Sequence, residues 1–201
     1  SALLEAMQER EVTISRQTYA LPDPFFVMAT ENPLEVSGVY SLPEAQIDRF
    51  LFKLLIDYPS PNEEQGILKR NITTKTFDSF DLKPILNAGK IIDLQNKVKD
   101  VFTSEVIEEY IIKIVTKTRD KDWEMGKYIS YGGSPRASIA IYIASKAEAL
   151  MKGRDYVTPE DVREVVYPVL RHRIILNYEA EAEGITTDKV IKQILGKVNV
   201  S

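Results

Sequence analysis

Two closely spaced prolines, Pro59 and Pro61, divide this chain of 201 residues into two parts with different hydrophobic patterns. Before them, short apolar runs alternate with turn residues, which is typical of strands and loops. After them, apolar residues recur at helical spacing between capping residues, almost to the end of the chain. We therefore expect a partial α/β unit over residues 1–60, followed by an all-helical unit over residues 61–201.

The first part contains two kinds of strand pattern. Residues 11–14 alternate polar and apolar side chains, which predicts a half-buried strand, and residues 18–21 can return as its hairpin partner. Residues 25–30 and 50–56 are continuous apolar runs instead. Such runs are typical of strands that are covered on both faces in a parallel sheet.

Helical patterns accompany these strands. Residues 2–9 favour a helix from the first residue onward, with no capping residue before them, so we expect the chain to be a fragment of a longer protein. Ser41 and Glu44 have the spacing of a capping box. This spacing predicts a short helix that ends near Arg49.

The helices of the second part have clear boundary signals. Ser134-Pro135 and Thr158-Pro159 each place a capping hydroxyl before a proline at the first helical position. Gly184 and Gly196 lie where helix ends need a left-handed residue. Residues 71–87 are predicted to form an irregular link. Its expected anchors are Phe77 and Phe80, and the predicted helices cover residues 62–70, 88–101, 103–119, 134–152, 159–171, 177–183 and 187–195.

Composition excludes several classes of function. The net charge is −4 and no basic run is present, which gives no reason to expect a nucleic acid or an anionic membrane as partner. The absence of cysteine excludes disulfides, thiolate catalysis and cysteine-ligated metals, and it fits a reducing compartment. The apolar runs are too short to cross a bilayer, and no signal peptide is visible. We expect a cytoplasmic, soluble protein.

No phosphate-binding loop can be assigned in this chain. Such a loop needs Gly-x-x-x-x-Gly-Lys followed by Ser or Thr, whereas the three Gly-Lys pairs here lack both the first glycine and the hydroxyl. The Asp-Glu pair that coordinates Mg²⁺ is also missing, because Asp57 is followed by Tyr58. No metal cluster or serine triad can be assembled either, and the only histidine is His172. We therefore expect no ATP hydrolysis by this chain alone.

Three polar side chains are candidates for a role in nucleotide chemistry. Asn32 follows a buried run, where ligands bind in open α/β sheets and an amide can orient an attacking water, or it forms a simple turn before Pro33. Arg49 is either a cation at a helix C-terminus or an arginine finger that completes a neighbouring subunit's site. Arg136 lies in the first turn of a helix, where it either meets an anion such as phosphate or pairs with an acid such as Glu124.

Seven sequence blocks, taken in order, resemble the MoxR family of AAA+ ATPases. They cover about residues 2–58 and 132–195, whereas residues 61–130 match only weakly. The blocks are residues 3–9, Asn32-Pro33 with Glu35, Gly38 and Tyr40, residues 42–50, 133–137, 153–162, 169–173 and 178–184.

The resemblance implies a role for each candidate residue. Asn32 is then sensor 1, Arg49 the arginine finger and Arg136 sensor 2, at the end of an αβα core and in a helical lid. The hairpin at residues 11–21 resembles the family's insertion hairpin, which points toward the centre of a ring. A full family member carries its phosphate loop and Asp-Glu pair upstream of Ser1, and we expect ATP and Mg²⁺ to be held mainly there.

The resemblance also implies a ring-forming, most often hexameric, chaperone-like ATPase. Such proteins often act with partners that contain a von Willebrand factor A domain and aid the maturation of metal-containing enzymes. Two alternatives stay open at this point. One is the ATPase subunit of a metal chelatase, which shares this core, and the other is a non-enzymatic helical interaction module whose arginines are structural.

Overall fold

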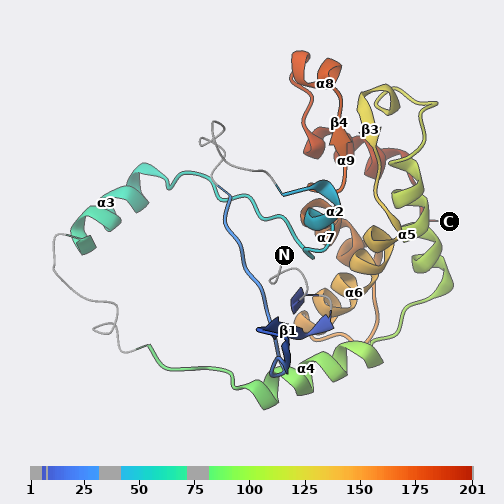
Figure 1. Ribbon diagram of the computed structural model, residues 1–201. Coiled ribbons are helices and arrows are strands. Elements are labelled where there is room, and N and C mark those ends of the chain that lie inside the picture. Colours follow the sequence, from blue (N-terminus) through green and yellow to red (C-terminus); the bar gives the residue numbers. More distant parts are fainter. Residues whose placement is uncertain (1–5, 8, 32–41, 72–81, 201) are drawn as a thin grey trace.

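The computed structural model describes residues 6–7, 9–31, 42–71 and 82–200 (Figure 1). The strands are β1 (Glu11–Ile14), β2 (Gln17–Ala20), β3 (Ile129–Tyr131) and β4 (Ile175–Leu176). The helical elements are α2 (Glu44–Ile47), α3 (Pro61–Asn71), α4 (Ala88–Asp100), α5 (Glu105–Lys117), the 3-10 helix η2 (Gly126–Tyr128), α6 (Pro135–Met151), α7 (Pro159–Leu170), α8 (Tyr178–Ala182) and α9 (Thr187–Lys197). The predicted helices of the second part are therefore present, with ends shifted by a few residues.

Helices α5, α6, α7 and α9 enclose one hydrophobic core, whereas α3 lies apart from it (Figure 1). Their buried residues are spaced three or four positions apart, as the period of an α-helix requires. Four of those on α6 are alanines, Ala137, Ala140, Ala144 and Ala149, and such small side chains allow a neighbouring helix to approach closely. The largest fully buried side chains include Tyr110, Ile114, Ile141, Val162, Val166, Leu170, Val190, Ile191 and Ile194.

Local hydrogen bonds begin these helices where the sequence predicts. The Ser134 hydroxyl accepts a hydrogen bond from the backbone N–H of Arg136 at the start of α6 (3.2 Å). At the start of α7, the Asp161 carboxylate accepts from both the backbone N–H and the hydroxyl of Thr158 (2.8 Å each). Gly184 has the predicted left-handed backbone, with φ of +63°. The same prediction for Gly196 is wrong, because α9 continues through it to Lys197.

The second part is not purely helical, which corrects the expectation of an all-helical unit. Strands β3 and β4 pair antiparallel, with Ile129 opposite Leu176. Strand β3 shortly precedes α6 and β4 follows the end of α7, so the packing of these two helices brings the strands together. The backbone N–H of Asn177 donates to the Tyr128 carbonyl (2.9 Å) beside this pair.

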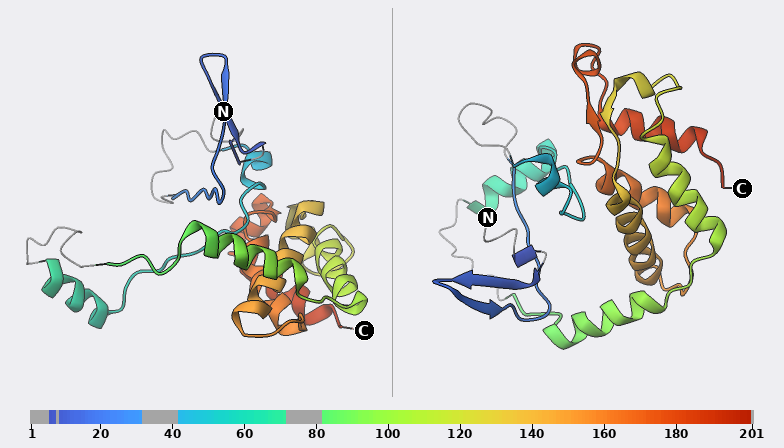
Figure 2. Two further views of the ribbon diagram at one scale, coloured as in Figure 1. Left: turned by 90° about the horizontal axis from the view of Figure 1, so that it is seen from below. Right: turned by 45° about the vertical axis from the view of Figure 1, so that its right-hand side comes forward.

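Strands β1 and β2 form an antiparallel pair in which Glu11 lies opposite Ala20 and Ile14 opposite Gln17. The two residues between them, Ser15 and Arg16, both have positive φ angles (51° and 69°). This is the backbone of a two-residue turn whose twist matches that of its strands. Figure 2 shows that the pair projects away from the helical core.

The predicted buried strands at residues 25–30 and 50–56 are wrong for this chain. Neither run is a strand, and both expose apolar side chains: Phe26 is 79% exposed and Ile56 is 94% exposed. A strand of a parallel sheet depends on neighbours that take up its backbone hydrogen bonds. The described part of the chain supplies no such neighbour to either run.

Several other predictions fall on residues that the structure does not describe. Helix α2 begins at Glu44 with Pro43 as its N-cap, and the predicted cap Ser41 lies outside the described residues. Phe77 and Phe80 lie outside them as well. Among the described residues, no helix is both long and apolar enough to span a membrane.

Candidate functional site

The structure describes two of the three candidate residues. Asn32 lies outside the described ranges, so its predicted role is not tested. Arg49 directly follows Asp48, the C-cap residue of α2, and Arg136 lies in the first turn of α6. Although these segments are far apart in sequence, Asp48 brings them together: its carboxylate oxygen Oδ2 lies 3.5 Å from an Nη atom of Arg136.

The start of α6 is held firmly against the end of α5. The backbone N–H of Gly133 donates to the Thr118 hydroxyl (2.9 Å), and Arg119 Nε donates to the Gly133 carbonyl (2.6 Å). A Cβ atom added to Gly132 would lie 2.4 Å from the Thr118 carbonyl oxygen, so only glycine fits there without a backbone shift. These contacts fix the position from which Arg136 projects.

The Arg136 side chain is only loosely held. It is 52% exposed, and the ion pair that it makes is the long contact to Asp48. The sequence left open an ion pair with an acid such as Glu124, and the acid found in the structure is Asp48. Because the cation lies at the N-terminus of a 17-residue helix, the helix dipole disfavours it there unless an anion is near.

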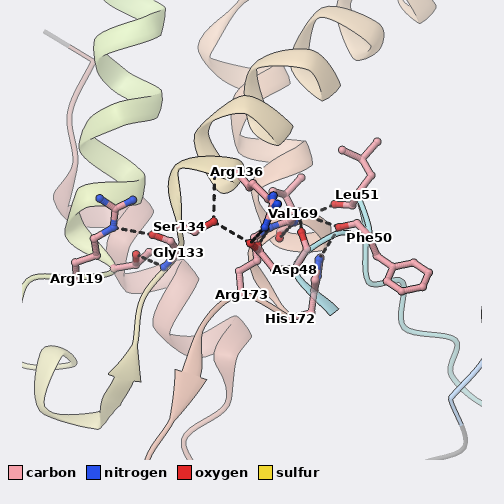
Figure 3. A network of polar contacts seen from close by, with 11 residues as sticks. Asp48, Phe50, Leu51, Arg119, Gly133, Ser134, Arg136, Val169, His172 and Arg173 are labelled. Atoms are coloured by element: carbon pink, nitrogen blue, oxygen red, sulfur yellow. Dashed lines mark hydrogen bonds and ion pairs between the residues drawn. The ribbon is translucent and has the colours of Figure 1, made fainter. Parts of the chain in front are cut away.

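Asp48 is the centre of a network that links α2 to the helical core (Figure 3). Its Oδ2 accepts a hydrogen bond from the Ser134 hydroxyl (2.9 Å), and its Oδ1 accepts one from Arg173 Nε (2.8 Å). The remaining Arg173 N–H groups donate to the backbone carbonyls of Asp48 (2.9 Å), Phe50 (2.7 Å), Leu51 (3.1 Å) and Val169 (2.6 Å). All five N–H groups of this guanidinium are thereby occupied.

His172 binds the same segment from beside Arg173. Its Nε2 lies 2.9 Å from the Phe50 carbonyl oxygen, which can only accept, so Nε2 carries the proton in the neutral ring. Nδ1 is buried without a hydrogen-bond partner among the described residues. Burial, followed by the nearby Arg173 cation, lowers the pKa of His172 to about 4. The neutral ring is therefore a structural contact at neutral pH.

Arg171 has a separate structural role. Its Nε and one Nη atom donate to the two carboxylate oxygens of Asp188 in α9 (2.8 and 2.9 Å). This two-point ion pair joins the end of α7 to the start of α9 and raises the pKa of Arg171. The sequence suggested no partner for this arginine, because Asp188 lies on another helix.

Arg49 lies at the edge of the network. Its Nε atom is buried and has no hydrogen-bond partner among the described residues. Buried polar groups normally have a hydrogen-bond partner, so this guanidinium nitrogen is an exception. Because this atom is inaccessible, it does not bear on the role of a finger, which stays a prediction for Arg49.

The charges of this site favour an anionic ligand. Two guanidinium groups, Arg136 and Arg173, share the single carboxylate of Asp48, which leaves an excess positive charge beside the N-terminus of α6. Burial lowers the pKa of Arg173, and repulsion from Arg136 lowers it further. In the part of the chain that the structure describes, no group of three His, Cys, Asp or Glu side chains could hold a metal ion. The site can therefore attract a phosphate but offers no ready-made metal centre.

Asp48 and Arg173 were missed as site residues. Both stand in sequence blocks that carry the family resemblance, yet no local pattern assigns them a role. A buried ion pair between residues 125 positions apart leaves no periodic signal in a sequence. The only sequence signal for the two residues was that each is a charged residue near the end of a helix, Asp48 at α2 and Arg173 after α7.

Two parts of the chain match models of known protein families. Residues 1–52 match the model of the ATPase family associated with various cellular activities (AAA), and residues 125–194 match the AAA lid domain. The fold and these matches define the class as AAA+ ATPases with a lid domain.

Individual relatives narrow the class further. The chain is 45% identical to the chaperone MoxR1 of Mycobacterium tuberculosis, over 98% of this chain and 52% of that protein. It is 45% identical to the uncharacterized protein YeaC of Bacillus subtilis, over 100% of this chain and 60% of that protein. A solved structure of a proposed ATPase from Cytophaga hutchinsonii is 44% identical, with a TM-score of 0.90 over 99% of this chain and 61% of that one. The chain corresponds to the C-terminal part of a MoxR-type AAA+ ATPase, and it spans about half to three fifths of the length of these relatives.

Proposed function

We propose that this chain is the sensor- and lid-bearing part of a Mg²⁺-dependent ATPase that assembles into a ring, expected to be hexameric, with ATP bound between subunits. The observation that carries the proposal is the half-exposed Arg136 guanidinium at the N-terminus of α6, held only by a 3.5 Å contact to Asp48. A half-exposed cation in the first turn of a helix is well suited to a phosphate ligand.

Each of the three candidate residues has a different role at the nucleotide. Arg136 binds the γ-phosphate, on its own subunit's nucleotide or on its neighbour's. Arg49 reaches the nucleotide of the next subunit and stabilises the charge that develops during phosphoryl transfer. Asn32 orients the attacking water. The phosphate loop and the Mg²⁺ ligands are expected from residues outside this chain, because its sequence contains no phosphate-loop motif and no Asp-Glu pair at the end of an apolar run.

The helical lid converts nucleotide binding into movement. Arg136 stands in the first turn of α6, and the buried face of α6 packs on α5 and α7. When Arg136 binds phosphate, any pull on its backbone therefore acts on a packed helix rather than on a loop. We propose that a client protein is remodelled by this motion, together with a partner that contains a von Willebrand factor A domain. The name of the M. tuberculosis relative, a chaperone, supports this use.

Nucleotide binding by the full-length protein tests the proposal. Replacing Arg136 by alanine removes the charged hydrogen bonds to the γ-phosphate, each worth about 1.5–3 kcal/mol, so Mg-ATP affinity should fall about tenfold or more. Mg-ADP affinity should change little, and calorimetric titration measures both. The matched control is Arg163→Ala, because Arg163 is also half-exposed but pairs with Glu160 on α7. Equal Mg-ATP affinity for the Arg136 variant and the wild type would contradict the assignment.

A further inference from the structure

The Asp48 carboxylate holds two cations in two different ways. Arg173 is only 3% exposed and donates to Asp48 through a hydrogen bond of 2.8 Å. Its other donors are bound to backbone carbonyls, so Arg173 cannot leave without breaking the docking of residues 48–51. Arg136 approaches the other carboxylate oxygen at 3.5 Å, beyond hydrogen-bond distance, and its side chain is half-exposed. One partner is fixed by several hydrogen bonds, whereas the other makes a single long contact (Figure 3).

A second group competes with Arg136 for the same oxygen atom. The Ser134 hydroxyl donates to Asp48 Oδ2 at 2.9 Å, and Ser134 is also the residue that caps α6. The attraction between Asp48 and Arg136 is therefore weaker while the Ser134 hydroxyl is hydrogen-bonded to Oδ2. Because the pair is only partly shielded from water, its attraction corresponds to a factor of about two to five in affinity, small enough for a phosphate to displace.

We propose that Asp48 is a positioning residue that holds the Arg136 guanidinium when no γ-phosphate is present and competes with the γ-phosphate for it. This inference rests on the proposed function, in which Arg136 binds that phosphate. Asp48 then lowers the affinity for ATP by a modest factor and returns Arg136 to a defined position after hydrolysis. Since Asp48 adjoins Arg49 in the chain, the same carboxylate links the sensing arginine to the segment that carries the finger.

Asp48→Asn in the full-length protein is the direct test. Asparagine keeps an oxygen acceptor for Arg173 and a polar partner for Ser134, but it removes the charge that attracts Arg136. Mg-ATP should bind about two- to fivefold more tightly, the factor that an ion pair of this strength corresponds to, whereas Mg-ADP affinity should stay the same. A role of Asp48 in folding alone would change both affinities together.

A double-mutant cycle separates this inference from the proposed function. In an Arg136→Ala background, Asp48→Asn should no longer change Mg-ATP affinity. If Arg136→Ala weakens Mg-ATP binding but Asp48→Asn leaves it unchanged, the role of Asp48 is overturned and the proposed function stands. If Arg136→Ala has no effect, the proposed function itself fails. Asp188→Asn is the matched control, because Asp188 binds Arg171 elsewhere in the lid and should leave both affinities unchanged.

A second substitution, expected to change Mg-ATP affinity in the opposite direction, tests the proposal if Asp48→Asn does not fold. Ser134→Gly removes the competing hydroxyl from Oδ2 and leaves an acceptable helix cap, since glycine is among the residues tolerated at the N-cap position. Asp48 should then hold Arg136 more strongly, so Mg-ATP affinity should fall about twofold. This loss should vanish in the Arg136→Ala background. A loss that persists there would overturn the proposal.

Discussion

Three arginines around Asp48 differ in how many of their donors are occupied. Arg173 uses all five N–H groups inside the protein, Arg136 has one long contact, and Arg49 has a buried Nε without a partner among the described residues. A guanidinium whose donors are saturated is part of the fold, whereas one with free donors can bind a ligand. At the scale of single residues, this difference separates the structural arginine from the two proposed to act on nucleotide.

Arg173 is expected to contribute strongly to the free energy of unfolding. Arg173→Met fills a similar space but leaves the Asp48 carboxylate and several carbonyls without their partner. Unfolding by denaturant should show a loss of about 3–5 kcal/mol, as for other broken buried ion pairs. Arg136→Ala, in the same network but half-exposed, should cost less than about 1 kcal/mol. Equal losses for the two variants would show that Arg173 is not the residue that docks the segment.

The lowered pKa of His172 predicts that the stability of the protein depends on pH. Its pKa is lowered to about 4 in the folded protein from an ordinary value of 6.5, so between these values the unfolded chain binds the proton more readily. Stability is therefore fully present above pH 6.5 and is lost as the pH falls toward 4. Allowing for partial exposure, the loss between pH 7 and pH 5 should be about 1–2 kcal/mol.

The control for this effect is His172→Gln, which keeps a donor for the Phe50 carbonyl but does not titrate in this range. The difference in unfolding free energy between wild type and variant should change with pH in the stated direction. A difference that stays constant from pH 7 to pH 5 would contradict a buried neutral histidine.

At the scale of elements, the loop before α6 decides where Arg136 points. Gly132→Ala would place a Cβ atom 2.4 Å from the Thr118 carbonyl oxygen, so the backbone must shift at a cost of about 1–3 kcal/mol. In the full-length protein, Mg-ATP affinity should fall because Arg136 moves with the start of α6. Gly66→Ala is the control: nothing lies within 4 Å of the added atom, and alanine favours helix α3. Unchanged stability and affinity of the Gly132 variant would refute this positioning role.

The elements also show which features a sequence can predict. Helices α6 and α7 were predicted because their caps, their first prolines and their apolar spacing are local signals. The runs at residues 25–30 and 50–56 were wrongly predicted as strands, because a strand forms only with neighbours that a single run does not specify. Arg136 could be singled out from its position against the helix dipole. Its partner Asp48 could not, since long-range pairing leaves no local pattern.

At the scale of the whole molecule, the segment after α2 joins the two parts of the chain. Arg173 and His172 bind its carbonyls, and the backbone N–H of Lys53 donates to the Pro168 carbonyl in α7 (2.8 Å). The residues around Arg49 are therefore attached to the lid that carries Arg136. This attachment provides a physical path by which a change at one arginine reaches the other.

ATP turnover in mixed rings tests the central claim most directly. In the full-length protein, Arg49→Ala should leave nucleotide affinity nearly intact and reduce turnover on the order of 10² or more, because the finger meets charge that develops in the transition state. Mixing it with a variant that lacks the phosphate-loop lysine should restore part of the activity, since some interfaces then contain both intact groups. If assembled rings of the Arg49 variant hydrolyse ATP at the wild-type rate, the finger assignment is wrong and Arg49 is only a cation at a helix end.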